Sequence, residues 1–136
     1  MTTGEDAAPL AAFTAHLPFG AASARTARGL VIELLADFSP PDRLVEDALL
    51  VVHELVVNGV SHGAPDDHQE IEVSCAVFPR ELVISVHDQG TAGTLDGHDR
   101  SPELTSGRGL LIVSRLSRRW SVDRAAGTRV SAHLPL

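Results

Sequence analysis

Residues 51–63 read VVHELVVNGVSHG and predict a helix that sets two polar residues among apolar ones. Glu54 and Asn58 are four positions apart, so they lie one above the other on one helical face. A carboxylate and an amide in such apolar company are costly unless each finds a partner. A divalent metal with bound water would suit the amide oxygen and give the carboxylate a task. The alternative, for this segment taken alone, is an exposed polar stripe on an amphipathic helix.

The helix around this segment is expected to cover residues 43–62. Asp42 offers a side-chain oxygen as its N-cap, and Gly63 is a residue typical of C-caps. A second amphipathic helix is expected at residues 21–38, with two prolines separating the pair. His62 falls near the face that carries the two polar residues, and a cation there also suits the end of the helix dipole.

Alternating apolar residues predict strands in the rest of the chain. The expected strands cover residues 11–17, 71–77, 82–86, 120–123 and 128–134, and a short helix is expected at 109–116. The stretch 88–106 lacks apolar periodicity and is rich in Gly, Asp, Thr and Ser, which is typical of a functional loop. The order of elements predicts the α+β class, a two-layer sandwich with helices on one face of a mostly antiparallel sheet.

Length and composition limit the function classes. The chain has 136 residues, from which we expect a flexible leader at 1–9 and a single domain at 10–136. A net charge of −7 argues against nucleic acid as the main partner, but a nucleotide needs only local donors and a metal. All eleven Lys and Arg residues are Arg, which excludes mechanisms that need a lysine. The single cysteine, Cys75, is expected to be a small buried side chain. Without a signal peptide or membrane-length apolar run, we expect a cytoplasmic protein with no membrane partner.

A second motif, VHDQG at residues 86–90, ends a predicted strand. A carboxylate leaving a strand before a glycine places an acceptor at the sheet edge with open backbone space beside it. That arrangement at Asp88 and Gly90 suits the exocyclic amine of a base, and the alternative is a plain strand-ending turn. His87 alternates to the opposite face, and the pattern gives it no role.

A third motif, Gly107-Arg108-Gly109, precedes the short helix. It would expose backbone N–H groups at the positive end of a helix dipole, and Arg108 could add a charged contact to phosphate. The alternative is a flexible hinge, and the third glycine of the dinucleotide fingerprint is missing. The pair Gly127-Thr128 opens the last strand, where threonine is an ordinary strand residue.

The order and spacing of these signals resemble a known family. Glu54-x-x-x-Asn58, Asp88-x-Gly90, Gly107-x-Gly109 and Gly127-Thr128 are similar to the N, G1, G2 and terminal Gly-Thr boxes of the gyrase/Hsp90/histidine-kinase/MutL (GHKL) ATPases. The resemblance covers about residues 10–136 and implies the Bergerat ATP-binding fold. Within that superfamily, residues 53–63, residues 107–116 and Trp120 look most like the anti-sigma-factor serine kinases of actinobacterial stress and sporulation switches.

The resemblance implies a role for each matched residue. Asn58 would coordinate Mg²⁺ bridging the ATP phosphates, and Glu54 would be the general base or would orient the attacking hydroxyl. Asp88 would accept from the adenine amino group, Thr128 would support it, and Gly90 would let the ring approach.

The remaining implied positions surround the phosphates. Gly107, Arg108, Gly109 and Leu110 would cradle them, His62 is a further nucleotide-site position, and residues 91–106 would form the ATP lid. Arg100 is the only basic residue of that lid, and either it or Arg108 could face the γ-phosphate.

The resemblance implies an ATP- and Mg²⁺-dependent serine/threonine kinase that phosphorylates an anti-anti-sigma partner and otherwise holds a sigma factor, working as a homodimer. The alternative is a weakly catalytic or non-catalytic module that sequesters a sigma factor or other regulator. Two departures from the family pattern concern catalysis: His53 stands where a small residue is common, and the lid lacks a clear second glycine box. A histidine kinase would also need a dimerising helical hairpin, for which the sequence offers no candidate.

Overall fold

The computed structural model describes residues 8–90 and 107–136, with side chains in α3 described from Gly109 onward. Its elements, in chain order, are β1 (Ala11–Pro18), α1 (Ser23–Leu35), the short 3-10 helix η1 (Ala36–Phe38), α2 (Asp42–His62), β2 (Glu70–Val77), β3 (Glu81–Asp88), α3 (Gly107–Leu116), β4 (Arg119–Asp123) and β5 (Thr128–Pro135). Every strand and helix predicted from the sequence is present, with ends that shift by a few residues. The expected leader at 1–9 and the expected lid at 91–106, with Arg100, lie wholly or mostly outside the described residues.

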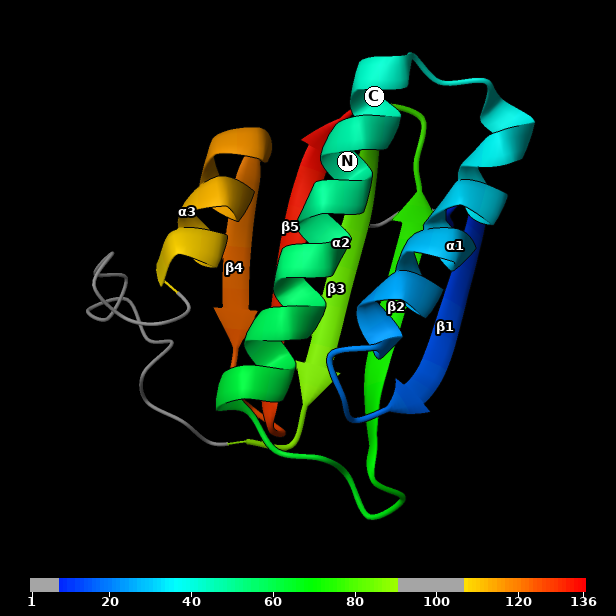
Figure 1. Cartoon of the computed structure of the whole chain (residues 1–136). Helices are drawn as coiled ribbons and strands as arrows, with labels where there is room; N and C mark the ends of the chain where they lie inside the picture. Colours follow the sequence, from blue (N-terminus) through cyan, green and yellow to red (C-terminus); the bar gives the residue numbers. More distant parts are fainter. Residues whose placement is uncertain (1–7, 91–106) are drawn as a thin grey trace.

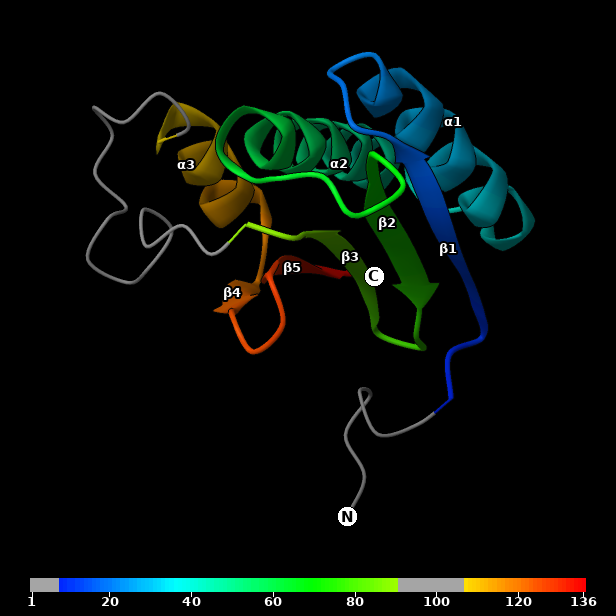
Figure 2. The ribbon, with the colours of Figure 1, turned by 90° about the horizontal axis from the view of Figure 1, so that it is seen from below.

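Five strands form one sheet in the order β1-β2-β3-β5-β4. Every neighbouring pair is antiparallel, and β3 at the centre pairs with β2 on one side and β5 on the other (Figure 1). The three α-helices cover one face of the sheet and leave the other uncovered, which Figure 2 shows in a view from below. The predicted α+β two-layer sandwich is therefore confirmed. None of the described helices is long and apolar enough to span a membrane.

The start of α2 differs from the prediction. Pro41, not Asp42, is the N-cap, and the helix begins with Asp42 itself. Proline fixes its own φ and ends the preceding segment in an extended conformation, so the next residue is already helical. The Asp42 carboxylate makes no cap hydrogen bond but lies in the first turn, where its charge suits the helix dipole. At the other end Gly63 is the C-cap, as predicted.

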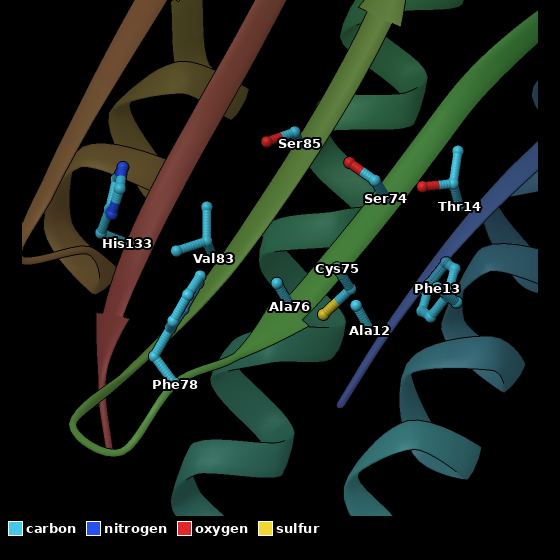
Figure 3. A pocket seen from close by; sticks show the side chains of 10 residues that line it. All are labelled: Ala12, Phe13, Thr14, Ser74, Cys75, Ala76, Phe78, Val83, Ser85 and His133. Carbon is cyan, nitrogen blue, oxygen red and sulfur yellow. The ribbon is translucent and has the colours of Figure 1, made fainter. Parts of the chain in front are cut away.

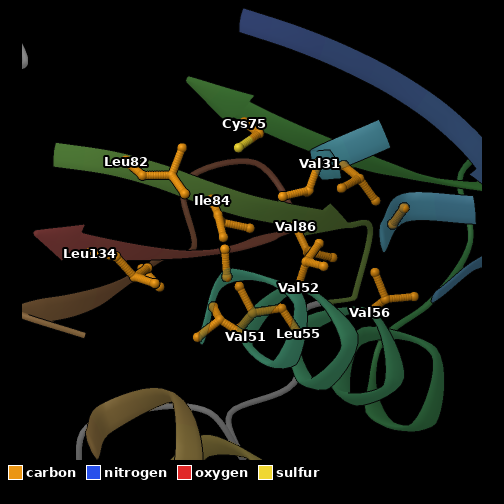
Figure 4. Packing of buried hydrophobic residues seen from close by; sticks show 14 of the residues in the cluster. Val31, Val51, Val52, Leu55, Val56, Cys75, Leu82, Ile84, Val86 and Leu134 are labelled. Atoms are coloured by element: carbon orange, nitrogen blue, oxygen red, sulfur yellow. The ribbon is translucent and has the colours of Figure 1, made fainter. Parts of the chain in front are cut away.

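Helix α2 supplies the centre of the hydrophobic core. Its buried residues Val52, Leu55 and Val56 face the sheet, where Ile84 and Val86 of β3 project toward them (Figure 4). Cys75 on β2 is buried in the same cluster, and burial raises the pKa of its thiol to about 12. The prediction that Cys75 is a small buried side chain is thus confirmed. Because the apolar residues around Glu54 and Asn58 are anchored in this core, the polar face of α2 has a fixed position.

The uncovered face of the sheet carries mainly small and polar side chains. Thr14, Ser74, Ser85 and Ser131 are cross-strand partners in consecutive strands, and the Ser85 and Ser131 hydroxyls are hydrogen-bonded at 2.8 Å. These small side chains leave a shallow hollow of about 300 Å³ (Figure 3). A second hollow, of about 250 Å³, is lined by Leu110, Leu111 and Ser114 of α3 and Trp120 of β4.

The core packing of α2 can be tested with two leucines of that helix. Leu55 is 1% exposed and Leu50 is 41% exposed. Leu55→Ala should lower the free energy of unfolding by about 2–5 kcal/mol, because it removes buried methyl groups and leaves a cavity. Leu50→Ala is the matched control and should change it by only about 0.5 kcal/mol. Urea unfolding of the two variants measures both, and equal losses would contradict the packing described here.

Candidate functional site

Asp88, the last residue of β3, holds the polar end of the sheet together. Its side chain is buried at 3% exposure. Oδ1 accepts hydrogen bonds from the backbone N–H of Gly90 at 2.6 Å and of Ala64 at 3.2 Å. Ala64 follows the C-terminus of α2, so one carboxylate oxygen connects the end of that helix to the end of β3. The other oxygen, Oδ2, takes part in neither bond.

Burial raises the pKa of the Asp88 carboxyl, and the hydrogen bonds from Gly90 and Ala64 oppose that shift. A buried carboxylate with an acceptor oxygen is a strong receptor for a neutral N–H donor, because a bond to a charged acceptor is stronger than one between neutral groups. The exocyclic amine of adenine is a donor of this kind. The geometry of Asp88 is therefore suited to the role that the sequence assigns to it.

Glycines let the backbone approach this carboxylate closely. A Cβ on Gly63 would lie 2.2 Å from the Asp88 carboxyl carbon, and a Cβ on Gly90 would lie 2.8 Å from Oδ1. Both distances are shorter than those found between a real Cβ atom and its neighbours, so a side chain at either position would force the surrounding atoms to shift. On the helix side, a Cβ on Gly59 would lie 3.7 Å from Oδ2, so α2 passes directly beside the carboxylate.

Thr128 completes this end of the site from β5. It is the cross-strand partner of Asp88, and its buried hydroxyl donates a hydrogen bond to the Gly90 carbonyl at 2.7 Å. The structure thus brings together Asp88, Gly90 and Thr128, as predicted from their separate motifs. Thr128 acts on Gly90, which orders the backbone beside the carboxylate.

The polar face of α2 forms the other part of the site. Asn58 is 4% exposed, and its Oδ1 has no hydrogen-bond partner among the described residues. His62, one turn further, also has a buried nitrogen, Nε2, without such a partner. A buried amide oxygen in this condition is costly unless a ligand satisfies it. Oxygen ligands are what Mg²⁺ prefers, so Asn58 fits a bound magnesium ion.

Glu54 lies one turn before Asn58 and faces the start of α3. A Cβ on Gly109 would lie 2.6 Å from Glu54 Oε1, so a larger residue at this position would displace the Glu54 carboxylate. The structure therefore brings Glu54 to Gly109 in the first turn of α3. Gly107 and Arg108 form the first turn of that helix, but their side-chain surroundings lie outside the described part. The Leu110 side chain is buried in the core, so it offers a ligand only its backbone.

Three contributors to the site were not predicted. The Ala64 N–H and the close approach of Gly59 and Gly63 are backbone features, and no side-chain pattern announces them. A Gly-Ala-Pro sequence after a helix indicates only a helix end. These backbone contacts could be found only from the packing of α2 beside β3, and that packing is known only once the tertiary fold is known.

One further group among the described residues has the spacing of a metal site. Donor atoms of His16, Asp66 and Glu70 lie within 4.8 Å of one another at the exposed or half-buried ends of β1 and β2. Asp66 already has a structural task there, because its Oδ1 accepts from the N–H groups of His68 at 2.8 Å and Glu70 at 2.9 Å. The hydrogen bond from Glu70 is the largest cause that lowers the pKa of the Asp66 carboxyl. We regard Asp66 as a turn anchor.

The model of the histidine kinase-like ATPase domain family matches residues 17–134. The chain therefore belongs to this family, and membership implies that it binds ATP. The N, G1 and terminal Gly-Thr motifs all fall inside the matched range.

A solved structure has the same fold. The structure of the RsbU and RsbW domains of Rv1364c from Mycobacterium tuberculosis superposes with a TM-score of 0.70 at 23% sequence identity, over 93% of this chain. This chain covers 32% of that one, about a third of its length. No curated protein matches the sequence.

The raised pKa of Asp88 predicts how stability depends on pH. Its pKa in the folded state lies above the unfolded value of 3.8, so the ionised form is disfavoured by folding. Asp88→Asn removes that charge and keeps an oxygen acceptor for the two backbone donors. The variant should therefore be more stable than wild type at neutral pH, and the difference should close as the pH falls toward about 4.

Asp66→Asn is the matched control of opposite sign. The pKa of Asp66 is lowered, so its ionised form stabilises the fold above pH 3.8 and loses this effect as the pH falls through the lowered pKa. This variant should be less stable than wild type at neutral pH, with a difference that also closes in acid. Urea unfolding between about pH 3.5 and pH 7 measures both. A loss of stability in both variants at neutral pH would contradict the buried-charge description of Asp88.

Proposed function

We propose that the chain is an ATP- and Mg²⁺-dependent serine/threonine protein kinase that acts as an anti-sigma factor. Its substrate would be a small anti-anti-sigma partner of the STAS type. The observation that carries the proposal is the polar face of α2, where the unpartnered Asn58 oxygen lies one turn from Glu54 and Glu54 faces the start of α3. Phosphoryl transfer needs charge neutralisation and a positioned nucleophile, and a metal ligand and a carboxylate base in adjacent turns would supply both.

Each residue has a defined task in this proposal. Asp88 Oδ2 accepts from the adenine amino group, while Thr128 holds the Gly90 carbonyl and so the backbone beside the ring. The first N–H groups of α3, at Gly107 and Gly109, would receive the phosphates, because the dipole of a helix favours negative charge at its start. Asn58 would hold Mg²⁺, which would supply positive charge against the phosphates.

Glu54 would act on the substrate hydroxyl. The hydroxyl oxygen forms a bond to the γ-phosphorus as the bond from that phosphorus to the β-bridging oxygen breaks, so that ADP leaves. The hydroxyl proton passes to the Glu54 carboxylate. Catalysis of this kind depends mainly on positioning and charge neutralisation, which a small site can provide. Arg100 and Arg108 remain the two candidates for a contact to the γ-phosphate.

The alternative function is a binding module that sequesters a sigma factor or another regulator, with little or no catalysis. One observation favours a protein-binding role of either kind. A groove of about 410 Å³ is lined by Arg28 of α1 and by Glu46, Leu49, Leu50 and His53 of α2. Leu50 in this groove and Ile32 on α1 are both substantially exposed. A homodimer forms part of both proposals through the family resemblance.

Nucleotide binding is tested by calorimetric titration with ATP, with and without Mg²⁺. Asp88→Ala should weaken binding at least roughly tenfold, because hydrogen bonds to a charged acceptor contribute strongly. Asn58→Ala should abolish the tightening by Mg²⁺ and leave the metal-free affinity nearly unchanged. Asp66→Asn is the control, since its carboxylate anchors a turn outside this site. Binding by Asp88→Ala with wild-type affinity would remove adenine recognition from this residue.

Catalysis is tested by transfer of phosphate from ATP to a purified STAS-type protein. Glu54→Gln should reduce transfer roughly 10²- to 10⁴-fold while ATP affinity stays close to wild type, because it removes the base and keeps the shape of the side chain. Glu33→Gln, an exposed carboxylate on α1, is the matched control. If wild type binds ATP but transfers none, the binding module becomes the better description. Unchanged transfer by Glu54→Gln would remove the base from this position.

A further inference from the structure

His87 has a contact that its place in the sequence motif does not suggest. It precedes Asp88 on β3 and projects to the uncovered face of the sheet, where its side chain is 16% exposed. Its Nε2 is hydrogen-bonded to the backbone carbonyl of Ala126, in the turn between β4 and β5. A carbonyl only accepts, so Nε2 carries the proton and donates. The side chain therefore joins the end of β3 to a residue that lies 39 positions further along the chain.

Two charged residues flank His87 on the adjacent strands. Glu72 on β2 and Arg129 on β5 are the cross-strand partners of His87. The Glu72 carboxylate lies 4.0 Å from His87 Nδ1 and accepts a hydrogen bond from Arg129 Nη2 at 3.3 Å. The hydrogen bond between Arg129 and Glu72 therefore joins the two strands that lie on either side of His87.

The turn that His87 holds is pressed against the end of β3. Gly127 has a φ of 79°, and a Cβ at this position would lie 2.3 Å from the Asp88 carbonyl oxygen and 3.1 Å from His87 Nε2. Glycine is needed here for the backbone conformation and for the contact. The next residue is Thr128, whose hydroxyl donates to the Gly90 carbonyl. Movement of this turn would therefore move the group that orders Gly90 beside Asp88.

We infer that His87 is a positioning residue for the nucleotide site, and that it acts through the β4–β5 turn from the opposite face of the sheet. The hydrogen bond to Ala126 fixes the turn, the turn fixes Thr128, and Thr128 fixes Gly90 next to the Asp88 carboxylate. The inference rests on the proposed function in one respect only, namely that Asp88 and Gly90 at the end of β3 bind the adenine ring.

The test compares His87→Leu with His87→Gln in the full chain. Leucine removes the donor, whereas the glutamine side chain keeps an N–H donor at a similar reach. His16→Leu is the matched control, because His16 is the cross-strand partner of Glu72 on the other side and projects from the same face. Amide NMR spectra and hydrogen exchange of the unliganded proteins report on Gly90, Gly127 and Thr128 directly. Calorimetry then compares affinity for ATP and for GTP.

In His87→Leu, we expect shifted Gly90 and Thr128 amides, faster exchange at Gly127, and ATP affinity lower by roughly fivefold, as for loss of one hydrogen bond. GTP affinity should stay unchanged, since a loss of general stability would weaken both nucleotides. His87→Gln and His16→Leu should resemble wild type. Unchanged Gly90 and Thr128 amides in His87→Leu, or a failure of His87→Gln to restore them, would overturn the inference. If wild type binds no ATP, the proposed function fails, and the NMR comparison still decides the role of His87.

Discussion

The hydrogen bonds of the buried Asp88 carboxylate are the interaction on which the polar end of this molecule depends. The bond from the Ala64 N–H, at 3.2 Å, connects the segment after α2 to the end of β3, and the bond from the Gly90 N–H, at 2.6 Å, orders the backbone that follows this strand. Both bonds require the backbone to approach the carboxylate closely, without a side chain in between. Gly63 and Gly90 meet that requirement at the carboxylate, and Gly127 meets it at the strand end behind. The apolar residues of α2 pack in the hydrophobic core and so fix the position of this helix relative to the carboxylate. Any change in the packing of α2 on β3 would therefore reach the site.

The same region holds polar groups that the protein does not satisfy internally. Burial of Asp88 disfavours its charged form, and the Asn58 oxygen and the His62 nitrogen are buried without partners among the described residues. Each of these features lowers stability taken by itself. They occur together on one side of the sandwich, while the apolar cluster beneath them is continuous. Local departures from internal satisfaction are expected at functional sites, where a ligand supplies the missing partners.

The elements of the fold could be predicted because their signals are local. The 3.6-residue period of α2 and the alternation of β2 and β3 are visible in single segments, and the order of the motifs indicated which residues meet. What could not be predicted depends on the backbone or on register. Asp42 was wrong as an N-cap because Pro41 already ends the extended segment. The Ala64 N–H reaches Asp88 only once α2 packs beside β3, and His87 reaches Ala126 only once β3 and β5 pair in one particular register.

The hollow between α3 and β4 gives the molecule an internal optical reporter. Trp120 is the only tryptophan, and the chain contains no tyrosine, so near-ultraviolet emission comes from this one indole. It shares its hollow with Leu110, Leu111 and Ser114 of α3, the helix whose first turn carries Gly109 beside Glu54. Rearrangement of that helix would alter the polarity around the ring and hence the emission wavelength. Events at the start of α3 can therefore be followed in real time without attaching a dye.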